Sequence, residues 1–445
     1  MDSLNREETL KLLASMGVEL PPQTKLSDEA LEERLRKCVR SIQDINTLFP
    51  SRPAPLSSYS AWPTKGRHAM SVLEGIRRVN IGEALQIAKA RESGLSVEAE
   101  VYVNPFGDLR QTVMALGRSW DEGVRCCIVQ DPVADVPAIY LRMLEVRKID
   151  SKTPMILLLY HPISDRNSGP GAEWIAEKVR TLPKINAQGE VKIMRINATP
   201  LEQKLLLRIL NFNAKYVPSE YKADKTTAES PFTTSFIIPV APLSFKELGE
   251  LNQDTGCVVC GEKRTKTCSQ CQSVSYCSPE CQKEDWPAHK NRCKSIKGGT
   301  WRTIRIYNCV PGTEGLYTTM INRYGSVNSL QNAAKDVKPN DNSTPQPNIH
   351  GSKVFIVKMQ FANTLGSPTG PMPKNMLIYD RKRSFEVYFV ENGENRELFG
   401  EFVREMRHPE RGFPRAVKMY RWARWVSDWE LSVCLDRVPE ENIVW

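Results

Sequence analysis

The sequence lacks any long hydrophobic segment. Its longest apolar runs, such as residues 155–160, are far shorter than the roughly 20 residues that a membrane helix needs. The first eight residues, Met-Asp-Ser-Leu-Asn-Arg-Glu-Glu, also lack the apolar core of a secretory signal. We therefore expect a soluble intracellular protein, cytoplasmic or nuclear, that does not contact a membrane.

Concentrated positive charge and glycine-rich phosphate motifs are lacking as well. The net charge of +9 is spread over 445 residues, and the basic side chains alternate with acidic ones. A nucleic-acid-binding protein would instead carry a basic stripe on one face. Neither a G-x-G-x-x-G fingerprint nor a P-loop occurs. Binding of nucleic acid or nucleotides is therefore not predicted.

Cysteine, in contrast, is abundant and clustered. Seven of the 12 cysteines, and one of the five histidines, fall between residues 257 and 293. In a reducing compartment, clustered cysteines indicate metal binding and not disulfides. The spacing is C-x2-C, C-x2-C, C-x3-C and H-x3-C, which supplies eight ligands for two four-coordinate zinc ions. The eight are Cys257, Cys260, Cys268, Cys271, Cys277, Cys281, His289 and Cys293.

The local sequence indicates how these ligands are presented. Each C-x2-C pair predicts a tight knuckle, and Gly261 after the first knuckle supplies a residue that easily takes a positive φ. Ser278-Pro279 is a typical start of a helix. His289 and Cys293 are four residues apart, which places both on one face of that helix. Spacing alone allows two pairings of knuckles with the later ligand pairs. The sequential pairing joins the first four ligands, whereas an interleaved pairing would tie distant parts of this small segment together twice.

This segment resembles a MYND-type zinc finger. The resemblance covers all eight ligands, Tyr276 before the fifth ligand, and the stretch 281–290, Cys-Gln-Lys-Glu-Asp-Trp-Pro-Ala-His-Lys. The chain is also similar to fungal proteins that carry one such finger between flanking domains, through segments such as 376–380. The resemblance implies the interleaved sites, with Cys257, Cys260, Cys277 and Cys281 in the first and Cys268, Cys271, His289 and Cys293 in the second. It further implies a protein-interaction module whose groove, lined by Gln282 and Trp286, binds proline-containing peptides.

Before the finger, the pattern predicts an α/β domain. We expect a helical hairpin at 1–48, a linker with helices at 49–95, and a mainly parallel sheet at 96–217 followed by a connector at 218–250. The expected strands are 97–103, 124–130, 155–160 and 191–196. The expected helices are 107–118, 138–146, 172–182 and 205–210. Cys126 and Cys127, adjacent in one strand, should point to opposite faces as buried apolar residues.

Polar residues follow the expected strands and suggest a second candidate site. Parallel α/β sheets bind ligands beyond the carboxyl ends of their strands. These positions hold Asn104 and Asp108, Asp131 and Asp135, His161 and Asp165, and Asn197. Asp131, His161 and Asp165 could form a hydrolytic site. The same residue types are also ordinary turn formers and helix caps, which is the interpretation we favour.

After the finger, we expect an α+β domain at 299–445. Strands are predicted at 304–306 and 355–361, a hairpin from 376–379 and 385–389, a helix at 395–406, and a disordered insertion at 335–352. Trp422, Trp425 and Trp429 are spaced i, i+3, i+7, which predicts one helix face. We expect these rings to form a packed core, with an aromatic cage as the alternative.

Two functions follow from this sequence. The first is a zinc-binding interaction or scaffold protein that recruits a protein partner through the finger and has no catalytic residues. The second is an enzyme, hydrolase-like, with the finger as an accessory. Some relatives of the finger are embedded in SET-type lysine methyltransferases, but neither an Asn-His-Ser-Cys-type nor a Gly-Glu-Glu-Leu-type segment is found here. Methyltransfer is therefore not predicted. Each zinc site has four protein ligands, so the zinc is expected to be structural.

Overall fold

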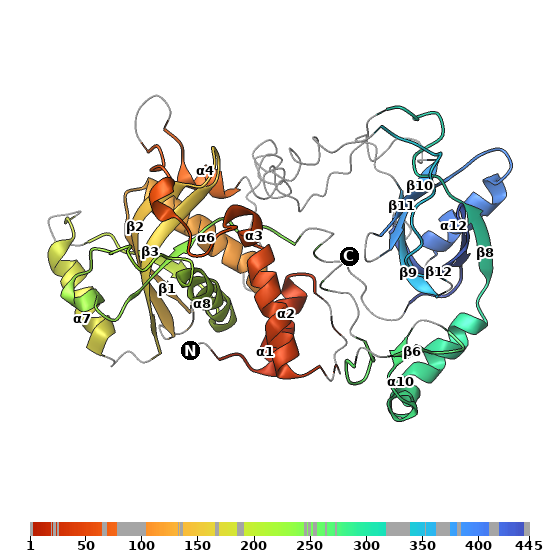
Figure 1. Ribbon diagram of the computed structural model, residues 1–445, viewed down its shortest axis with the longest axis horizontal. Helices are drawn as coiled ribbons and strands as arrows, with labels where there is room; N and C mark the ends of the chain where they lie inside the picture. Colours follow the sequence, from red (N-terminus) through yellow and green to blue (C-terminus); the bar gives the residue numbers. More distant parts are fainter. Residues whose placement is uncertain are drawn as a thin grey trace. The chain divides into compact units, whose positions relative to one another are not determined.

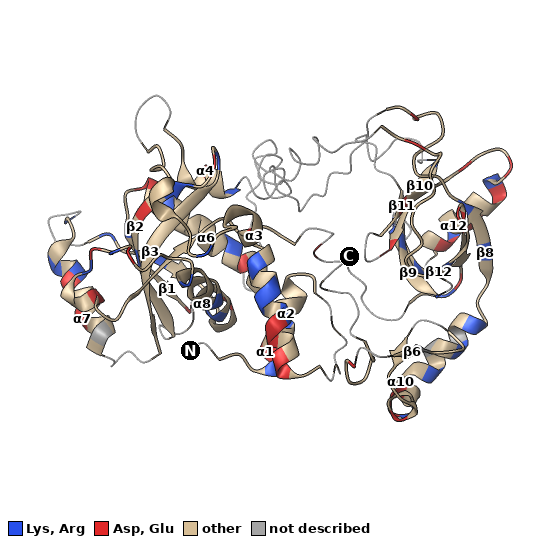
Figure 2. Ribbon diagram, in the orientation of Figure 1, with Lys and Arg blue, Asp and Glu red and all other residues tan. Residues whose placement is uncertain are grey.

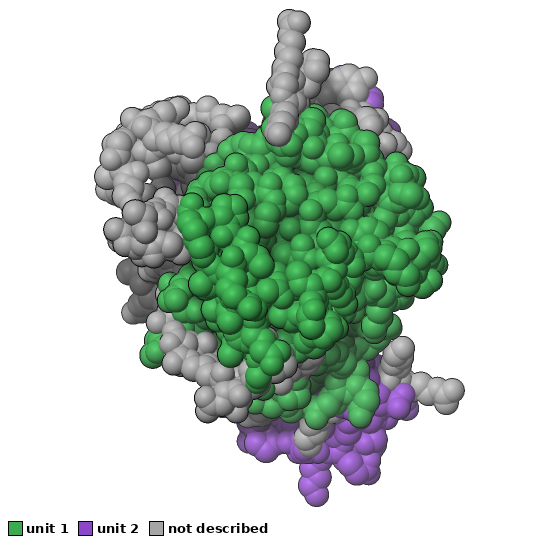
Figure 3. Space-filling model, turned by 90° about the vertical axis from the view of Figure 1, so that its left-hand side faces the viewer, with its two compact units in different colours: residues 1–18, 28–243, 321–333 green, residues 19–27, 244–320, 334–445 purple. Residues whose placement is uncertain are grey.

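The computed structural model divides into two compact units, coloured separately in Figure 3. The first is built mainly from residues 28–243 with the N-terminal residues 1–18, and the second mainly from residues 244–320 and 334–445. The structure describes residues 3–439 except 19, 21–23, 25, 65–68, 78–103, 132, 134–136, 165–168, 185–190, 244–246, 248–250, 252–255, 263–264, 272–273, 317–338, 352, 362–373, 381–383 and 409–417. The strand expected at 97–103 lies outside the described residues.

A five-stranded sheet organises the first unit, in the order β4-β1-β2-β3-β5. Its strands are β1 (Cys126–Gln130), β2 (Ala138–Lys148), β3 (Pro154–Ile163), β4 (Met194–Asn197) and β5 (Thr233–Ile237). Only β1 and β4 are parallel, and every other neighbouring pair is antiparallel. The prediction of a mainly parallel sheet is therefore wrong.

The error arises at residues 138–146, which we expected to be a helix and which lie in strand β2. Ile139, Leu141 and Met143 are buried on alternate residues, and the register shifts between Met143 and Glu145, so that the next buried residue is Val146. The shift interrupts the alternation that would have indicated a strand. Without a helix at 138–146, β1, β2 and β3 follow one another as antiparallel neighbours instead of parallel strands joined by a crossover.

Helices cover both faces of this sheet. Helices α6 (Pro105–Asp121) and α8 (Pro200–Ala214) lie on one side and α7 (Gly169–Thr181) on the other (Figure 1). Cys127 contacts Ser119 of α6, with 3.4 Å between sulfur and oxygen, whereas Cys126 belongs to the cluster around Trp174 of α7. The two adjacent cysteines are both buried and face opposite sides.

Shorter elements complete the first unit. These are α1 (Arg6–Ser15), α2 (Asp28–Ser41), α3 (Ile45–Leu48), η1 (Leu56–Ser58), α4 (Val72–Arg77) and η2 (Thr227–Glu229). Asn5 begins α1 with a capping box, in which its side chain and that of Glu8 each accept a backbone N–H of the other residue. Glu229 in η2 is fully buried and forms ion pairs with Arg142 at 2.7 Å and Lys178 at 2.8 Å. These ion pairs tie η2 to β2 and α7.

The second unit contains the cysteine-rich segment and a six-stranded antiparallel sheet in the order β11-β10-β9-β12-β13-β8. The cysteine-rich segment supplies β6 (Lys266–Thr267), β7 (Ser275–Tyr276) and α10 (Pro279–Lys297). The sheet is formed by β8 (Trp301–Arg305), β9 (Phe355–Phe361), β10 (Asn375–Asp380), β11 (Glu386–Val390), β12 (Lys418–Ser427) and β13 (Glu430–Cys434), with helix α12 (Arg396–Met406) packed against it. The sequence predicts a disordered insertion at 335–352, of which the structure describes residues 339–351. In this stretch the backbone carbonyls of Asp341 and Thr344 accept hydrogen bonds from the side chain of Asn308.

The C-terminal tryptophans lie in strands and not in a helix. Trp422 and Trp425 belong to β12, and Trp429 lies in the turn before β13. A spacing of three places two side chains on the same face of a helix but on opposite faces of a strand. Trp425 accordingly packs in the core with α12, whereas Trp422 packs on the other face of the sheet, against the cysteine-rich segment.

That second contact joins the cysteine-rich segment to the sheet within one unit. We call it the finger–sheet cluster. Its buried residues are Cys257, Val259, Cys268, Cys271, Tyr276, Cys293 and Ile296 from the cysteine-rich segment, Trp422 and Cys434 from the sheet, and Val354 just before β9. The cysteine-rich segment therefore buries its apolar side chains against β9, β12 and β13, which offsets its small core.

Candidate metal centre

The first knuckle is built by tight backbone turns. The N–H of Gly261 donates to the carbonyl of Cys257 at 2.8 Å, and Gly261 has a φ of +78°. The N–H of Cys257 donates to the carbonyl of Glu262 at 2.8 Å, which closes the loop from the other side. Gly256 has a φ of +67°, and a Cβ there would lie 2.3 Å from that same carbonyl oxygen. Glycine is therefore required at position 256.

Helix α10 presents the later ligands. It begins after Ser278, whose side chain accepts the N–H of Cys281 at 3.3 Å, and Pro279 occupies its first turn. Cys277 and Cys281 flank this helix start. His289 and Cys293 lie one turn apart within the helix, and both are buried. A serine cap and a four-residue spacing thus place three ligands within a single helix and a fourth, Cys277, just before it.

The eight ligand atoms gather in two clusters. Cys257, Cys260, Cys277 and Cys281 form the first, and Cys268, Cys271, His289 and Cys293 form the second, with the ligand atoms of each lying within 4.8 Å of one another. This is the interleaved grouping of knuckles and helical pairs. Each cluster therefore joins a knuckle to a ligand pair that follows it at a distance in the sequence.

Distances within the clusters fit tetrahedral zinc. The sulfur–sulfur distances are 3.4 Å for Cys260–Cys277, 3.5 Å for Cys277–Cys281 and 3.8 Å for Cys268–Cys293. Zinc–sulfur bonds of about 2.3 Å at tetrahedral angles place sulfurs about 3.8 Å apart. The Sγ of Cys271 lies 3.4 Å from Nε2 of His289, so this ring nitrogen faces the second cluster. The two clusters are the sites of two structural zinc ions.

The backbone also prepares a thiolate for the metal. Burial alone would raise the pKa of the Cys257 thiol. Hydrogen bonds from the backbone of Cys260, Cys277 and Val259 together outweigh burial and lower this pKa to about 6. Since zinc binds the thiolate and not the thiol, these N–H groups favour the metal-binding form at neutral pH.

One surface of α10 is held in place by the second zinc site. The ring of Trp286 lies 6.0 Å from that of His289, and Tyr276 meets the same histidine edge-on at 6.1 Å. The Tyr276 hydroxyl donates to Asp285 at 2.6 Å. Trp286 is half-buried, and Gln282, one turn earlier on α10, is half-buried as well. A metal ligand thus fixes the position of a partly exposed tryptophan.

Comparison with known families identifies this segment. The MYND finger family matches residues 257–293, which span all eight ligands. Residues 257–293 are a MYND finger. The MYND resemblance predicted from sequence, and the two structural zinc ions, are confirmed. MYND fingers generally mediate protein interactions.

Each of the curated relatives matches a short stretch of the chain. Ubiquitin carboxyl-terminal hydrolase 19 of Arabidopsis thaliana is 52% identical over 50 residues, which are 11% of this chain and 7% of that protein. SET domain and MYND-type zinc finger protein 6 of Schizosaccharomyces pombe is 42% identical over 52 residues, or 11% of each chain. Human histone-lysine N-methyltransferase SMYD3 is 49% identical over 37 residues, which are 8% of this chain and 9% of that protein.

The chain thus matches about a tenth or less of the length of these relatives. No solved structure matches the chain. Among the described residues, no helix is both long enough and apolar enough to cross a membrane.

Two of the polar residues at the expected strand ends, Asn104 and Asp131, have structural roles. Asn104 caps α6 by accepting the N–H groups of Phe106 and Gly107. The side chain of Asp131 accepts the N–H of Val133, as in a turn. Asp135 and Asp165 lie outside the described residues. The capping interpretation thus suits Asn104 and Asp131.

The candidate hydrolytic residues Asp131 and His161 lie on opposite sides of β2. In the sheet register Gln130 pairs with Ala138, and Ala138 pairs with Ile163, so β1 and β3 are two strand spacings or about 10 Å apart. The imidazole of His161 stacks on Phe232 at 5.2 Å, and burial lowers its pKa. The register therefore separates Asp131 from His161.

Sequence reasoning missed two features of the structure. One is the role of Trp422, which packs on the finger; residues 418–427 do not alternate between polar and apolar side chains, so no sequence signal indicated it. The other is Glu202, a fully buried carboxyl in the first turn of α8 that accepts a hydrogen bond from Thr112 of α6 at 2.6 Å. Its helical position gave no signal, because acidic residues are ordinary in first turns.

Proposed function

We propose that this chain is an interaction protein whose MYND finger recruits a partner through a proline-containing peptide. Gln282 and Trp286 contact the peptide, and the two zinc ions hold the surface that presents them. The single observation that carries the proposal is the half-buried indole of Trp286 packed beside the zinc ligand His289. An aromatic ring fixed at the surface costs little entropy when it packs against proline.

The neighbouring side chains support this surface as a peptide site. Gln282 and Trp286 are four residues apart and so lie on the same face of α10. An amide next to an indole offers both hydrogen bonding to a peptide backbone and an apolar ring for a proline. Trp286 also packs on the finger–sheet cluster, so its ring is held from below by buried side chains. Rings held in this way carry much of the affinity in many interfaces.

Basic residues on the same helix lie near the negatively charged zinc sites. Lys283, Lys290, Lys294 and Lys297 of α10 are exposed, and basic residues colour this helix in Figure 2. Fully ligated, the first zinc site carries a formal charge of −2 and the second −1, which these lysines offset.

Calorimetric titration of the full-length, zinc-loaded protein against a library of proline-containing peptides tests this proposal. We expect micromolar binding by a subset of peptides. Trp286→Ala should weaken that binding by roughly 30-fold, corresponding to the loss of about 2 kcal/mol typical of a central aromatic residue. Gln282→Ala should weaken it by a smaller factor. The matched control is Trp429→Ala, which removes a half-buried tryptophan in the turn before β13.

Two results would count against the proposal. If no peptide binds, or if Trp286→Ala binds as tightly as Trp429→Ala, the surface of α10 is not the recruitment site. Zinc content measured on each variant separates a lost contact from a lost fold, because a folded finger retains two zinc ions per chain.

A further inference from the structure

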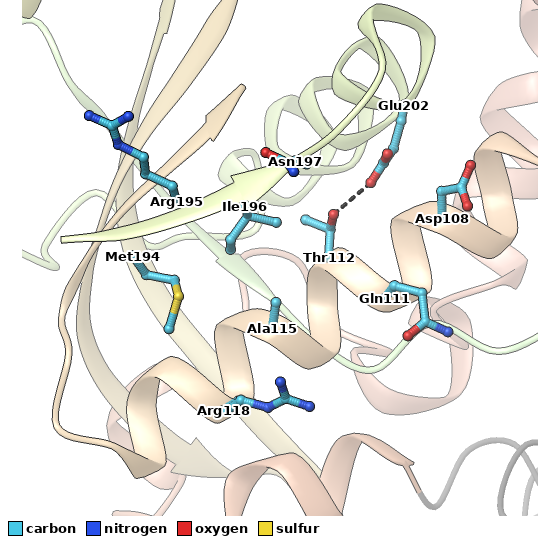
Figure 4. A pocket seen from close by; sticks show the side chains of 10 residues that line it. All are labelled: Asp108, Gln111, Thr112, Ala115, Arg118, Met194, Arg195, Ile196, Asn197 and Glu202. Atoms are coloured by element: carbon cyan, nitrogen blue, oxygen red, sulfur yellow. Dashed lines mark hydrogen bonds between the residues drawn. The ribbon is translucent and has the colours of Figure 1, made fainter. Parts of the chain in front are cut away.

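A pocket of about 270 Å³ in the first unit has no part in the proposed function. It lies where α6, β4 and the first turn of α8 meet (Figure 4). Its inner wall is acidic, because it includes Asp108 of α6, which is 7% exposed, and Glu202 of α8, which is 1% exposed. Two buried carboxyl groups that line one pocket are uncommon, since charged groups are rarely buried.

The carboxyl group of Glu202 is only half satisfied. Its Oε1 accepts the hydroxyl proton of Thr112 at 2.6 Å, whereas its buried Oε2 has no hydrogen-bond partner among the described residues. Figure 4 shows the carboxyl groups of Glu202 and Asp108 approaching the same end of the pocket from two helices. A buried acceptor without a donor is costly, and in a native structure it calls for an explanation, such as a bound ion or another group that donates to it.

Among the described residues that line the pocket, none is a cationic partner of Glu202. Burial, together with the neighbouring charge of Asp108, raises the pKa of Glu202 to about 7. The basic residues lining the pocket are Arg118 of α6 and Arg195 of β4, and both are exposed. In Figure 4 the side chain of Arg195 points away from Glu202, and Arg118 lies ten residues along α6 from Asp108, or about 15 Å. Lys204, two residues after Glu202, pairs instead with Glu8 at 2.6 Å.

We propose that this pocket binds a small organic cation, whose ammonium or guanidinium group donates hydrogen bonds to Glu202 and Asp108. Nitrogen cations carry several N–H donors and no acceptor, which matches two carboxyl groups. A volume of about 270 Å³ exceeds by far the roughly 30 Å³ of a water molecule, so the pocket has room for a molecule and not only for a metal ion. Arg118, at the other end, can pair with a carboxylate, so a free amino acid suits both ends.

Calorimetric titration of the full-length, zinc-loaded protein at pH 6 tests this inference. The probes are n-butylammonium, L-arginine, butyrate, magnesium chloride and a lysine-containing tripeptide with blocked ends. We expect n-butylammonium and L-arginine to bind, with L-arginine the tighter of the two. Binding should release protons, because the cation favours the ionised form of Glu202. The measured heat should therefore change with the ionisation enthalpy of the buffer.

Variants locate the site. Glu202→Gln keeps a hydrogen-bond acceptor for Thr112 and removes the negative charge. It should weaken the binding of both cations at least tenfold and abolish the proton release. Glu220→Gln is the matched control, since Glu220 is an exposed carboxylate of the same unit outside the pocket, and it should bind as the wild type does. Thermal unfolding of each variant verifies that it is folded.

Several outcomes would overturn the inference. They are no binding by either cation, binding of butyrate or magnesium alone, equal binding by the wild type and Glu202→Gln, and binding of the tripeptide without the free cations. The last of these would assign the pocket to a protein side chain. None of them bears on the MYND finger, whose peptide titration is a separate measurement.

Discussion

Loss of the second zinc site should loosen the C-terminal sheet as well as the finger. Cys293 is fully buried, is a ligand of that site and belongs to the finger–sheet cluster with Trp422 of β12. Cys293→Ala removes one of four ligands. Structural zinc contributes on the order of 10 kcal/mol to folding, which is comparable with the 5–15 kcal/mol stability of a whole domain. The finger should therefore unfold in this variant.

The effect on the sheet can be estimated from Trp422. A buried tryptophan covers about 200 Å², and if roughly half of that area faces the finger, its exposure costs about 2–3 kcal/mol at 25 cal/mol/Å². Amide hydrogens of β12 and β13 that exchange by local opening should then exchange roughly 30- to 150-fold faster.

Hydrogen exchange followed by mass spectrometry measures this change. The matched control is Cys309→Ala, because Cys309 is also buried in the second unit but lies outside both metal clusters. Faster exchange in β12 and β13 is expected in Cys293→Ala and not in the control. Unchanged exchange in these strands, with zinc lost, would refute the idea that the finger stabilises the sheet.

Three further predictions concern individual residues. Glu202→Gln should stabilise the protein at pH 8 by up to about 3 kcal/mol and leave its stability unchanged near pH 4. The reason is that the folded-state pKa of Glu202 is raised to about 7, so the wild-type protein loses stability as pH rises from the unfolded-state pKa toward 7. Urea unfolding at both pH values measures this, and equal stabilisation at both would contradict it. Burial opposes the ionisation of Glu229, but hydrogen bonds from Lys178 and Arg142 outweigh burial and lower the pKa of Glu229 to about 2. The contribution of ionised Glu229 to folding stability is therefore present above pH 4.5 and is lost as pH falls toward 2. Glu229→Gln should therefore cost about 3–5 kcal/mol at pH 7 and much less at pH 2, as measured by thermal unfolding, and a loss independent of pH would argue against the ion pairs. Gly256→Ala should lower the zinc content or the zinc affinity of the first site, because the added Cβ would lie 2.3 Å from the carbonyl oxygen of Glu262. A competition titration with a chromogenic chelator measures the zinc affinity. An affinity equal to that of the wild type would show that the loop adjusts to the alanine.

The metal centre could be predicted from the sequence because its ligands are presented by short segments whose backbone structure depends on a few neighbouring residues. Cysteine spacing, Gly261 after a knuckle and Ser278-Pro279 at a helix start each specify a short piece of backbone. The pairing of knuckles with helical ligands depends on how these pieces meet, and spacing left it open. Only the family resemblance implied the interleaved grouping that the ligand distances display.

The sheet of the first unit could not be predicted in the same way. Residues 138–148 alternate between the two faces only as far as Met143, where a register shift displaces the pattern. Strand direction then depends on whether this one segment is a strand or a helix. The prediction of a helix for the segment with Trp422, Trp425 and Trp429 was wrong for a related reason. Trp422 and Trp425 are spaced as on one helix face, but they pack in two different cores on opposite faces of the sheet. In both segments, packing against residues distant in the sequence determines that the backbone forms a strand.

We propose above that Trp286 contacts a recruited peptide on a surface held by zinc. The most direct measurement is the indole N–H spectrum of the ¹⁵N-labelled, zinc-loaded protein during titration with a bound proline-containing peptide. The chain has nine tryptophans, and a Trp286→Phe variant assigns the resonance of Trp286. We predict that this resonance shifts with peptide, whereas that of the buried Trp422 does not. A saturating peptide that leaves the Trp286 resonance unmoved would contradict the claim.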